Sequence, residues 1–274
     1  MRLSICLLAS LCCATNLVAQ GDSTAPHAAA PGAAHHIAAG DSAGPMHPDV
    51  ALRHYQEALA VDSTNYEADW KAARAIADVA KQIQGNDDSL KNRRDSLYSV
   101  GRTYAERAIR ADSTQADGHY ALAMVLGRLS RTRGGKERVR FAKVIYDEAA
   151  RAVAINPNHD NAHHVLGAWN AEVKRLSGFT YFFAKTLYGG GFMSKANWPD
   201  AVSHLEKAVE INPQHIYHRL ELAEVYVDLD QYSKAREQLQ VIATLPNYDV
   251  LDHQYKDDAV ALLDEIKNKK DKSS

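Results

Sequence analysis

The fold of this chain is decided by a stretch that reads Ala201-Val202-Ser203-His204-Leu205-Glu206-Lys207-Ala208-Val209-Glu210-Ile211-Asn212-Pro213. Ala201, Leu205 and Ala208 share one face of a helix, and Pro213 blocks its continuation. The same spacing returns upstream at Ala51-Tyr55-Ala58-Ser63, Gly101-Ala105-Ala108-Ser113 and Ile145-Ala149-Ala152-Pro157. Such a repeat is typical of stacked helical hairpins, which usually form a binding surface.

A second landmark follows each turn at a constant offset. Nine residues after each of the four turn residues comes a pair ending in a small residue: Ala72-Ala73, Leu122-Ala123, Leu166-Gly167 and Leu222-Ala223. The arrangement resembles tetratricopeptide repeats, most closely at Leu222-Ala223, Tyr226, Ala235, Leu239 and Ile242. This resemblance implies an all-α, helical-hairpin solenoid, wound as a right-handed superhelix. The turns are spaced more widely than the family's roughly 34-residue period, so extra residues must lengthen helices or the turns within hairpins.

Periodicity and breakers predict the helices of a domain over residues 48–268. We predict an opening helix over 49–60, hairpins of 65–84 with 88–110, 116–130 with 138–154, 160–176 with 198–211 and 216–228 with 232–244, and a C-terminal capping helix over 252–267. Val260, Leu263 and Ile266 should face inward from this last helix. We expect residues 269–274 to form a disordered tail.

The first twenty residues predict export. Arg2 precedes an apolar run from Leu3 to Val18, and small residues near Ala19 suit cleavage, as in a signal peptide over 1–20. We expect a periplasmic or extracellular protein, with an uncleaved membrane anchor as the alternative. All the cysteines lie in this leader: Cys6, Cys12 and Cys13. The chain that remains after cleavage then has no disulfide, thiolate metal site or cysteine nucleophile.

Residues 21–47 are rich in Ala, Gly, Pro and His, which predicts a flexible linker. His27, His35, His36 and His47 raise the alternative of a metal site. Chelation by a flexible segment carries a large ordering cost, so we predict no metal.

The charges are nearly balanced, with 32 Lys and Arg against 34 Asp and Glu, and nothing indicates nucleic-acid binding. One local basic cluster surrounds the Gly134-Gly135 turn: Arg128, Arg131, Arg133, Lys136, Arg138 and Arg140. This cluster is either a solvated loop or a contact for an acidic partner or anionic lipid.

The third hairpin carries an aromatic insertion over residues 177–197. It holds Phe179, Phe182, Phe183 and Phe192, which are four of the five phenylalanines of the chain. Such a segment either folds back over the stack or presents aromatic anchors to a partner. The Gly189-Gly190-Gly191 run should end a short helix there.

This region carries a more specific resemblance. Ala162-His163-His164-Val165-Leu166-Gly167-Ala168-Trp169, then Leu176-Ser177 and Ala184-Lys185-Thr186-Leu187-Tyr188-Gly189, resemble the regulator of microtubule dynamics family, over about residues 50–265. That family is all-helical, has no agreed catalytic motif, and is named for animal members linked to microtubules and organelle membranes. The resemblance implies the fold and a scaffold role; an exported chain would not meet tubulin.

We predict no enzyme and no cofactor. No HExxH, GxSxG, phosphate-binding loop or CxxC motif occurs. His163 and His164 should be packed or hydrogen-bonded within the third hairpin, and a polar pocket beside a carboxylate would argue for catalysis instead.

The sequence therefore predicts a non-catalytic scaffold that binds a protein or peptide on its concave face, lined by the first helix of each hairpin. The candidate partner-binding residues are Tyr120, Asn170, Tyr226, Phe179, Phe182, Phe183, Tyr188 and Phe192. The alternative is a peripheral membrane or lipid-binding module that uses the same insertion.

Overall fold

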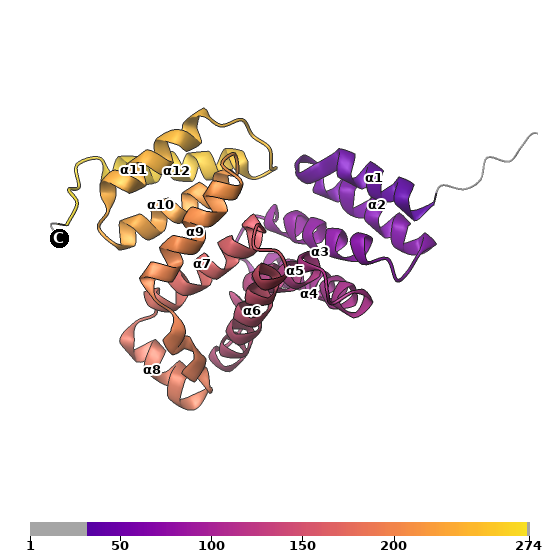
Figure 1. The fold of residues 1–274 in the computed structure, drawn as a ribbon, viewed down its shortest axis with the longest axis horizontal. Helices are drawn as coiled ribbons and strands as arrows, with labels where there is room; N and C mark the ends of the chain where they lie inside the picture. Colours follow the sequence, from indigo (N-terminus) through magenta and orange to yellow (C-terminus); the bar gives the residue numbers. More distant parts are fainter. Residues whose placement is uncertain (1–31, 273–274) are drawn as a thin grey trace, which may run out of the picture. The chain divides into compact units, whose positions relative to one another are not determined.

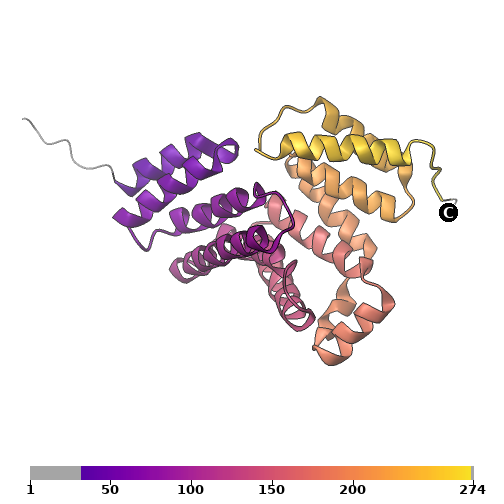
Figure 2. The ribbon, with the colours of Figure 1, turned by 180° about the vertical axis from the view of Figure 1, so that it is seen from behind.

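The computed structural model describes residues 32–272, which contain helices and no strand. The predicted hairpins are present: α3 (Tyr66–Lys81) with α4 (Asp88–Ala111), α5 (Ala116–Ser130) with α6 (Gly135–Ile155), α7 (Asp160–Arg175) with α9 (Trp198–Ile211), and α10 (Ile216–Asp228) with α11 (Tyr232–Thr244). α2 (Pro48–Val61) precedes them and α12 (Asp252–Ile266) follows, as Figures 1 and 2 show from two sides. The predicted signal peptide lies outside the described residues.

Small residues hold the hairpins together. Ala58, Ala108, Ala152 and Ala208, one from each repeat of the pattern, are fully buried. A Cβ added at Gly167 would lie 2.5 Å from Cγ of Leu205 on the partner helix. Close helix contact therefore requires these residues to stay small.

Extra residues enlarge the middle hairpins in two ways. α4 has 24 residues and α6 has 21, against 14 in α9. In the third hairpin, α8 (Gly178–Leu187) and the short 3₁₀ helix η2 (Gly190–Lys195) intervene between α7 and α9. Gly189 takes the left-handed conformation (φ 73°) at the end of α8, so the glycine run ends this helix as predicted.

The predicted flexible linker over 21–47 is wrong for its second half. Residues Ala33–Ala43 form α1, which packs along α2, and the 3₁₀ helix η1 (Gly44–Met46) joins the two. Ile37 and Gly40 are buried, and the ring of Tyr55 lies directly against Gly40. The Tyr55 hydroxyl also donates to Asp41 Oδ1 at 2.9 Å. Close packing of alanine and glycine replaces the apolar stripe by which a helix is usually recognised.

The predicted disordered tail is also partly ordered. Ser233 N, in the first turn of α11, donates to the carboxylate of Asp271 at 2.8 Å, and Lys272 N donates to the carbonyl of Asp230. The tail thus caps a helix whose own N-cap residue provides no side-chain hydrogen bond. Residues 273 and 274 lie outside the described range.

The inward face of α12 differs by one position from the prediction. Ile266 is fully buried and Leu263 is half-buried, but Val260 is exposed. Ala259 takes the buried position, because Tyr255, Ala259 and Ile266 follow one helical face. In the loop before α12, Val250 N donates to the carbonyl of Pro45, 3.2 Å away, which joins the C-terminal end of the stack to η1.

Candidate functional site

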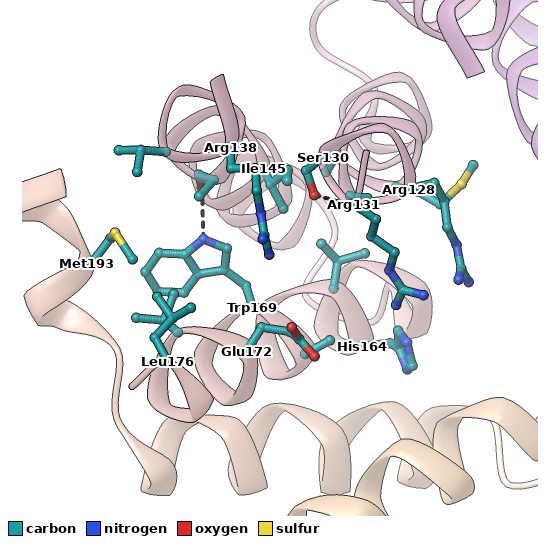
Figure 3. Close-up of a pocket in the computed structure, with 18 of the residues that line it drawn as sticks. Arg128, Ser130, Arg131, Arg138, Ile145, His164, Trp169, Glu172, Leu176 and Met193 are labelled. Atoms are coloured by element: carbon teal, nitrogen blue, oxygen red, sulfur yellow. Dashed lines mark hydrogen bonds between the residues drawn. The ribbon is translucent and has the colours of Figure 1, made fainter. Parts of the chain in front are cut away.

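The described helices enclose a groove of about 460 Å³. Its residues come from the first helices of the four hairpins, α3, α5, α7 and α10, and also from α6, α8, η2 and α12. Figure 3 shows one part of it, between α7 and the adjoining ends of α5 and α6. Helices that alternate between the two sides of the stack place every first helix on this face.

Repeat spacing accounts for several of the residues that point into the groove. Tyr120 and His164 each stand seven residues after their turn landmark. Asp78, Arg128 and Glu172 each stand fifteen residues after theirs, two helical turns further along. Equivalent positions of successive repeats therefore form rows along the groove.

Aromatic residues form the apolar part of the groove. The indole nitrogen of Trp169 donates to the carbonyl of Ala142 at 2.8 Å, which fixes the ring between α7 and α6. Tyr217 of α10 stacks on Tyr255 of α12 with ring centroids 4.7 Å apart. Burial raises the pKa of Tyr255 to about 12, so its hydroxyl stays protonated and available as a donor.

The groove also carries three arginines without an acidic partner. Arg128, Arg131 and Arg138 line it and form no ion pair with any residue in the range 32–272. Figure 3 shows Arg131 and Arg138 extended toward α7. Arg128 lies over the ring of Tyr217, 5.6 Å from its centroid. These side chains present guanidinium groups to whatever enters the groove.

The other basic residues of the Gly134-Gly135 cluster behave differently. Arg133 pairs with Asp95 at 2.9 Å, and Arg140 pairs with Glu137 at 3.2 Å. The cluster therefore contains groove residues, ion-paired surface residues and Lys136, which is exposed and forms no ion pair with a described residue.

Two of the three acidic groups that line the groove are ion-paired, and the third, Asp249, forms no ion pair with a described residue. Asp78 pairs with Lys81 at 2.7 Å and lies 3.9 Å from Arg74. Glu172 pairs with Arg175 at 3.2 Å. The groove consequently presents an excess of positive charge, although the whole chain carries a formal charge of −2.

A chain of imidazoles borders the groove. Nδ1 of His164 lies 3.2 Å from Nδ1 of His218, and Nε2 of His218 lies 3.3 Å from Oδ2 of Asp160. Because a carboxylate only accepts, His218 carries its proton on Nε2, and its Nδ1 accepts from His164. The ring of His215 stacks on His218 with centroids 3.9 Å apart.

Burial keeps two of these histidines neutral at ordinary pH. Burial, followed by the neighbouring His218, lowers the pKa of His164 well below its usual value and that of His215 to about 3. Burial acts to raise the pKa of Asp160, but hydrogen bonds from His218 and Asn212 lower it below its usual range. The chain Asp160–His218–His164 thus joins one carboxylate to two buried rings and can orient a hydrogen-bonding group at the groove wall.

His163 faces elsewhere. Its Nε2 donates to the carbonyl of Pro157, and its Nδ1 lies 2.9 Å from Nδ1 of His204 on α9. It does not line the groove. The adjacent histidines therefore do not share a pocket.

The structure brings together four of the predicted partner-binding residues. Tyr120, Phe179, Phe183 and Tyr188 all line the groove. Phe182 lies on α8 outside the groove and is 59% exposed.

The other three predicted residues support the fold. Phe192 packs against the buried cluster that contains Trp169. Asn170 is buried, donates to the carbonyl of Leu166 and accepts from Asn197 N, which anchors the end of the insertion. Tyr226 is buried and donates to Glu206 at 2.6 Å.

The insertion both folds back and remains exposed. Ala184 and Met193 are buried in the cluster around Trp169. Phe179, Phe182 and Leu187 are 75%, 59% and 63% exposed. α8 therefore has one face on the stack and one apolar face in solvent.

Helical hairpins stacked around a groove lined by their first helices define a tetratricopeptide-like repeat protein. Its fold matches a thermophilic TPR protein of Thermus thermophilus, with a TM-score of 0.58 and 17% identity over 84% of this chain and 99% of that one. The chain belongs to the family described as Regulator of microtubule dynamics protein 1-3, whose model matches residues 39–267.

Animal members of the family are similar along much of this chain. Regulator of microtubule dynamics protein 3 of Xenopus laevis is 26% identical over 179 residues, which is 65% of this chain and 37% of that protein. Regulator of microtubule dynamics protein 1 of Bos taurus is 24% identical over 203 residues, 74% of this chain and 62% of that protein. The chain thus spans less than two thirds of the length of either relative.

Proposed function

We propose that this protein is an exported, non-catalytic scaffold that binds an acidic, apolar-containing segment of a partner protein in its groove. The observation that carries the proposal is the set Arg128, Arg131 and Arg138, which have no acidic partner in the described chain and stand beside Trp169 and Tyr217. Guanidinium groups bind carboxylates in bidentate fashion, and aromatic rings bind apolar side chains. The fold belongs to a class that typically mediates protein–protein interaction.

Selection of peptides from a random displayed library tests this proposal. Wild-type protein should enrich peptides with Asp or Glu next to apolar residues, and their affinity should fall as salt rises. The triple variant Arg128→Ala/Arg131→Ala/Arg138→Ala should bind the selected peptides roughly tenfold or more weakly, since each charged hydrogen bond contributes about 1.5–3 kcal/mol.

The matched control removes the same charge outside the groove. Arg140, Lys143 and Arg151 are exposed residues of α6 that do not line it, and their triple alanine variant should bind like wild type. Equal weakening in both variants would mean that net charge, and not the groove, governs binding. Enrichment of peptides without acidic residues would contradict the proposed chemistry.

Export is proposed from the leader-like pattern of residues 1–20 alone. N-terminal sequencing of the protein from its native host should find a chain that begins near residue 21. A chain that retains residues 1–20 in the soluble cytoplasmic fraction would contradict export.

A second candidate function is attachment to a membrane surface, which the exposed apolar face of α8 favours. None of the described helices is long and apolar enough to cross a bilayer. Phe179→Ser/Phe182→Ser should abolish co-sedimentation with anionic vesicles under this function. If the protein instead binds only a peptide in its groove, neither the wild type nor this variant should sediment with vesicles.

A further inference from the structure

Three potential metal ligands meet on the N-terminal hairpin, on α1 and α2. His36 of α1 places Nδ1 3.0 Å from Oε2 of Glu57, and His54 of α2 places Nδ1 2.8 Å from the same oxygen. His54 and Glu57 are three residues apart on one face of α2. One ligand atom from each residue lies within 4.8 Å of the other two.

The hairpin holds these side chains in place without a metal. Gly40 allows the ring of Tyr55 to lie against α1, and Ile37, beside His36, is buried at the same contact. Asp41 further joins the helices by accepting from Tyr55 and pairing with Lys71. The ordering cost that argues against chelation by a flexible segment does not apply to His36, because α1 is already ordered.

The atoms that form hydrogen bonds in this cluster are also of the kinds that bind metals. A carboxylate only accepts, so each Nδ1 that bonds to Glu57 must carry a proton. Two N–H groups directed at one carboxylate oxygen occupy the position that a cation would take. No Lys or Arg in the described chain forms an ion pair with Glu57, whose ion-pair partners there are these two histidines.

The separations also fit zinc. Ligand atoms about 2.0–2.1 Å from a tetrahedral zinc lie roughly 3.3 Å from one another. The two separations from Oε2 of Glu57, 2.8 and 3.0 Å, need to widen by only a few tenths of an ångström, and the ligand atoms of the two imidazoles lie within 4.8 Å of each other. The side chains of His36, His54 and Glu57 are 19%, 30% and 42% exposed, so water can complete the coordination.

We propose that His36, His54 and Glu57 form a zinc site that joins α1 to α2. Two imidazoles and one carboxylate are a donor set that zinc uses in proteins, with a further position left to water. The site lies apart from the groove, and its existence does not depend on the function proposed for the groove.

Zinc titration of the purified protein tests the proposal. The protein is prepared without a histidine tag, treated with a chelator, and titrated with Zn²⁺ against a chromophoric competitor. We expect one Zn²⁺ per chain at this site and a higher Tm in its presence. His36→Gln, His54→Gln and Glu57→Gln should each weaken binding roughly tenfold or more and abolish the Tm increase.

The controls separate this site from other histidines. His47→Gln and His253→Gln change exposed imidazoles outside the cluster and should leave the affinity unchanged. Absence of 1:1 binding by wild type, or unchanged binding by the cluster variants, would overturn the proposal. Should a variant lose helical structure, X-ray absorption of the wild-type zinc complex decides: two imidazoles in the first shell support the site, and one or none overturns it.

Discussion

The ring of His163 donates a hydrogen bond from Nε2 to the carbonyl oxygen of Pro157, 3.0 Å away. Two other repeats make the same contact six residues after the turn landmark. His119 donates to the carbonyl of Ser113 at 3.0 Å, and Arg219 donates to that of Pro213 at 2.9 Å. The contact ties three of the four first helices, α5, α7 and α10, to the turn before each, with either His or Arg as the donor.

Two substitutions at His163 should show whether stability requires a histidine here or only a hydrogen-bond donor. His163→Ala should lower the free energy of unfolding by about 1–2 kcal/mol, because the carbonyl of Pro157 loses its donor. His163→Arg should retain most of the stability, since Arg219 makes the equivalent contact. Urea unfolding followed by circular dichroism measures both. An equal loss of unfolding free energy in the two variants would show that the contact of His163 with His204 contributes more than its hydrogen bond to Pro157.

Gly167 should not tolerate a methyl group. Gly167→Ala places Cβ 2.5 Å from Leu205 Cγ and 3.0 Å from the carbonyl of Ala201, so the free energy of unfolding should fall by about 1–3 kcal/mol. Gly127→Ala is the matched control, because an added Cβ there meets nothing within 4 Å. It should gain up to about 1 kcal/mol from helix propensity. Thermal unfolding of the two variants should thus shift in opposite directions.

His215 should make the protein less stable in acid. Its pKa is lowered to about 3 in the folded protein by burial and by His218, so the unfolded chain binds the proton first. The contribution of the neutral His215 ring to the free energy of unfolding is fully present above pH 6.5 and is lost as pH falls toward 3. At pH 5 the loss is about 2 kcal/mol. His215→Asn should flatten the dependence of the urea midpoint between pH 7 and pH 5 relative to wild type. His253→Asn, at an exposed position, should keep the wild-type slope.

The two halves of the insertion should differ in their effect on stability. Met193→Ser should lower the free energy of unfolding by about 2–5 kcal/mol, because this side chain is buried in the cluster around Trp169. Phe182→Ser should change it by less than about 0.5 kcal/mol, since the ring is exposed. A large loss in Phe182→Ser would indicate that the exposed face of α8 has a structural partner.

The repeat landmarks allow most helix ends to be predicted from the sequence. Pro157 and Pro213 stop helices, and residues such as Asp62 and Asp112 form repeated turns by accepting from the N–H groups of Thr64 and Thr114. These signals are local, so they can be identified without the tertiary structure. α1 was missed because its packing depends on Tyr55, a residue of another helix.

The candidate site was predicted less completely. Tyr120 lies on a first helix and lines the groove, as predicted. Tyr226 and Asn170 also lie on first helices, but Tyr226 bonds to Glu206 of α9 and Asn170 bonds to Asn197, the residue before α9. The basic cluster could be found from composition, but which of its residues form ion pairs depends in part on an acid distant in sequence. This acid, Asp95, pairs with Arg133 from another hairpin.

The unequal lengths of the hairpins bear on how reliably the chain folds. Repeats of identical length can pair a helix with the corresponding helix of the wrong neighbour, which is a common route to misfolded or swapped repeat proteins. Here the second helices of the three longer hairpins differ in length: α4 has 24 residues, α6 has 21, and α9 has 14 and follows α8 and η2. The irregularity that obscures the repeat in the sequence should thereby disfavour exchange among these three hairpins.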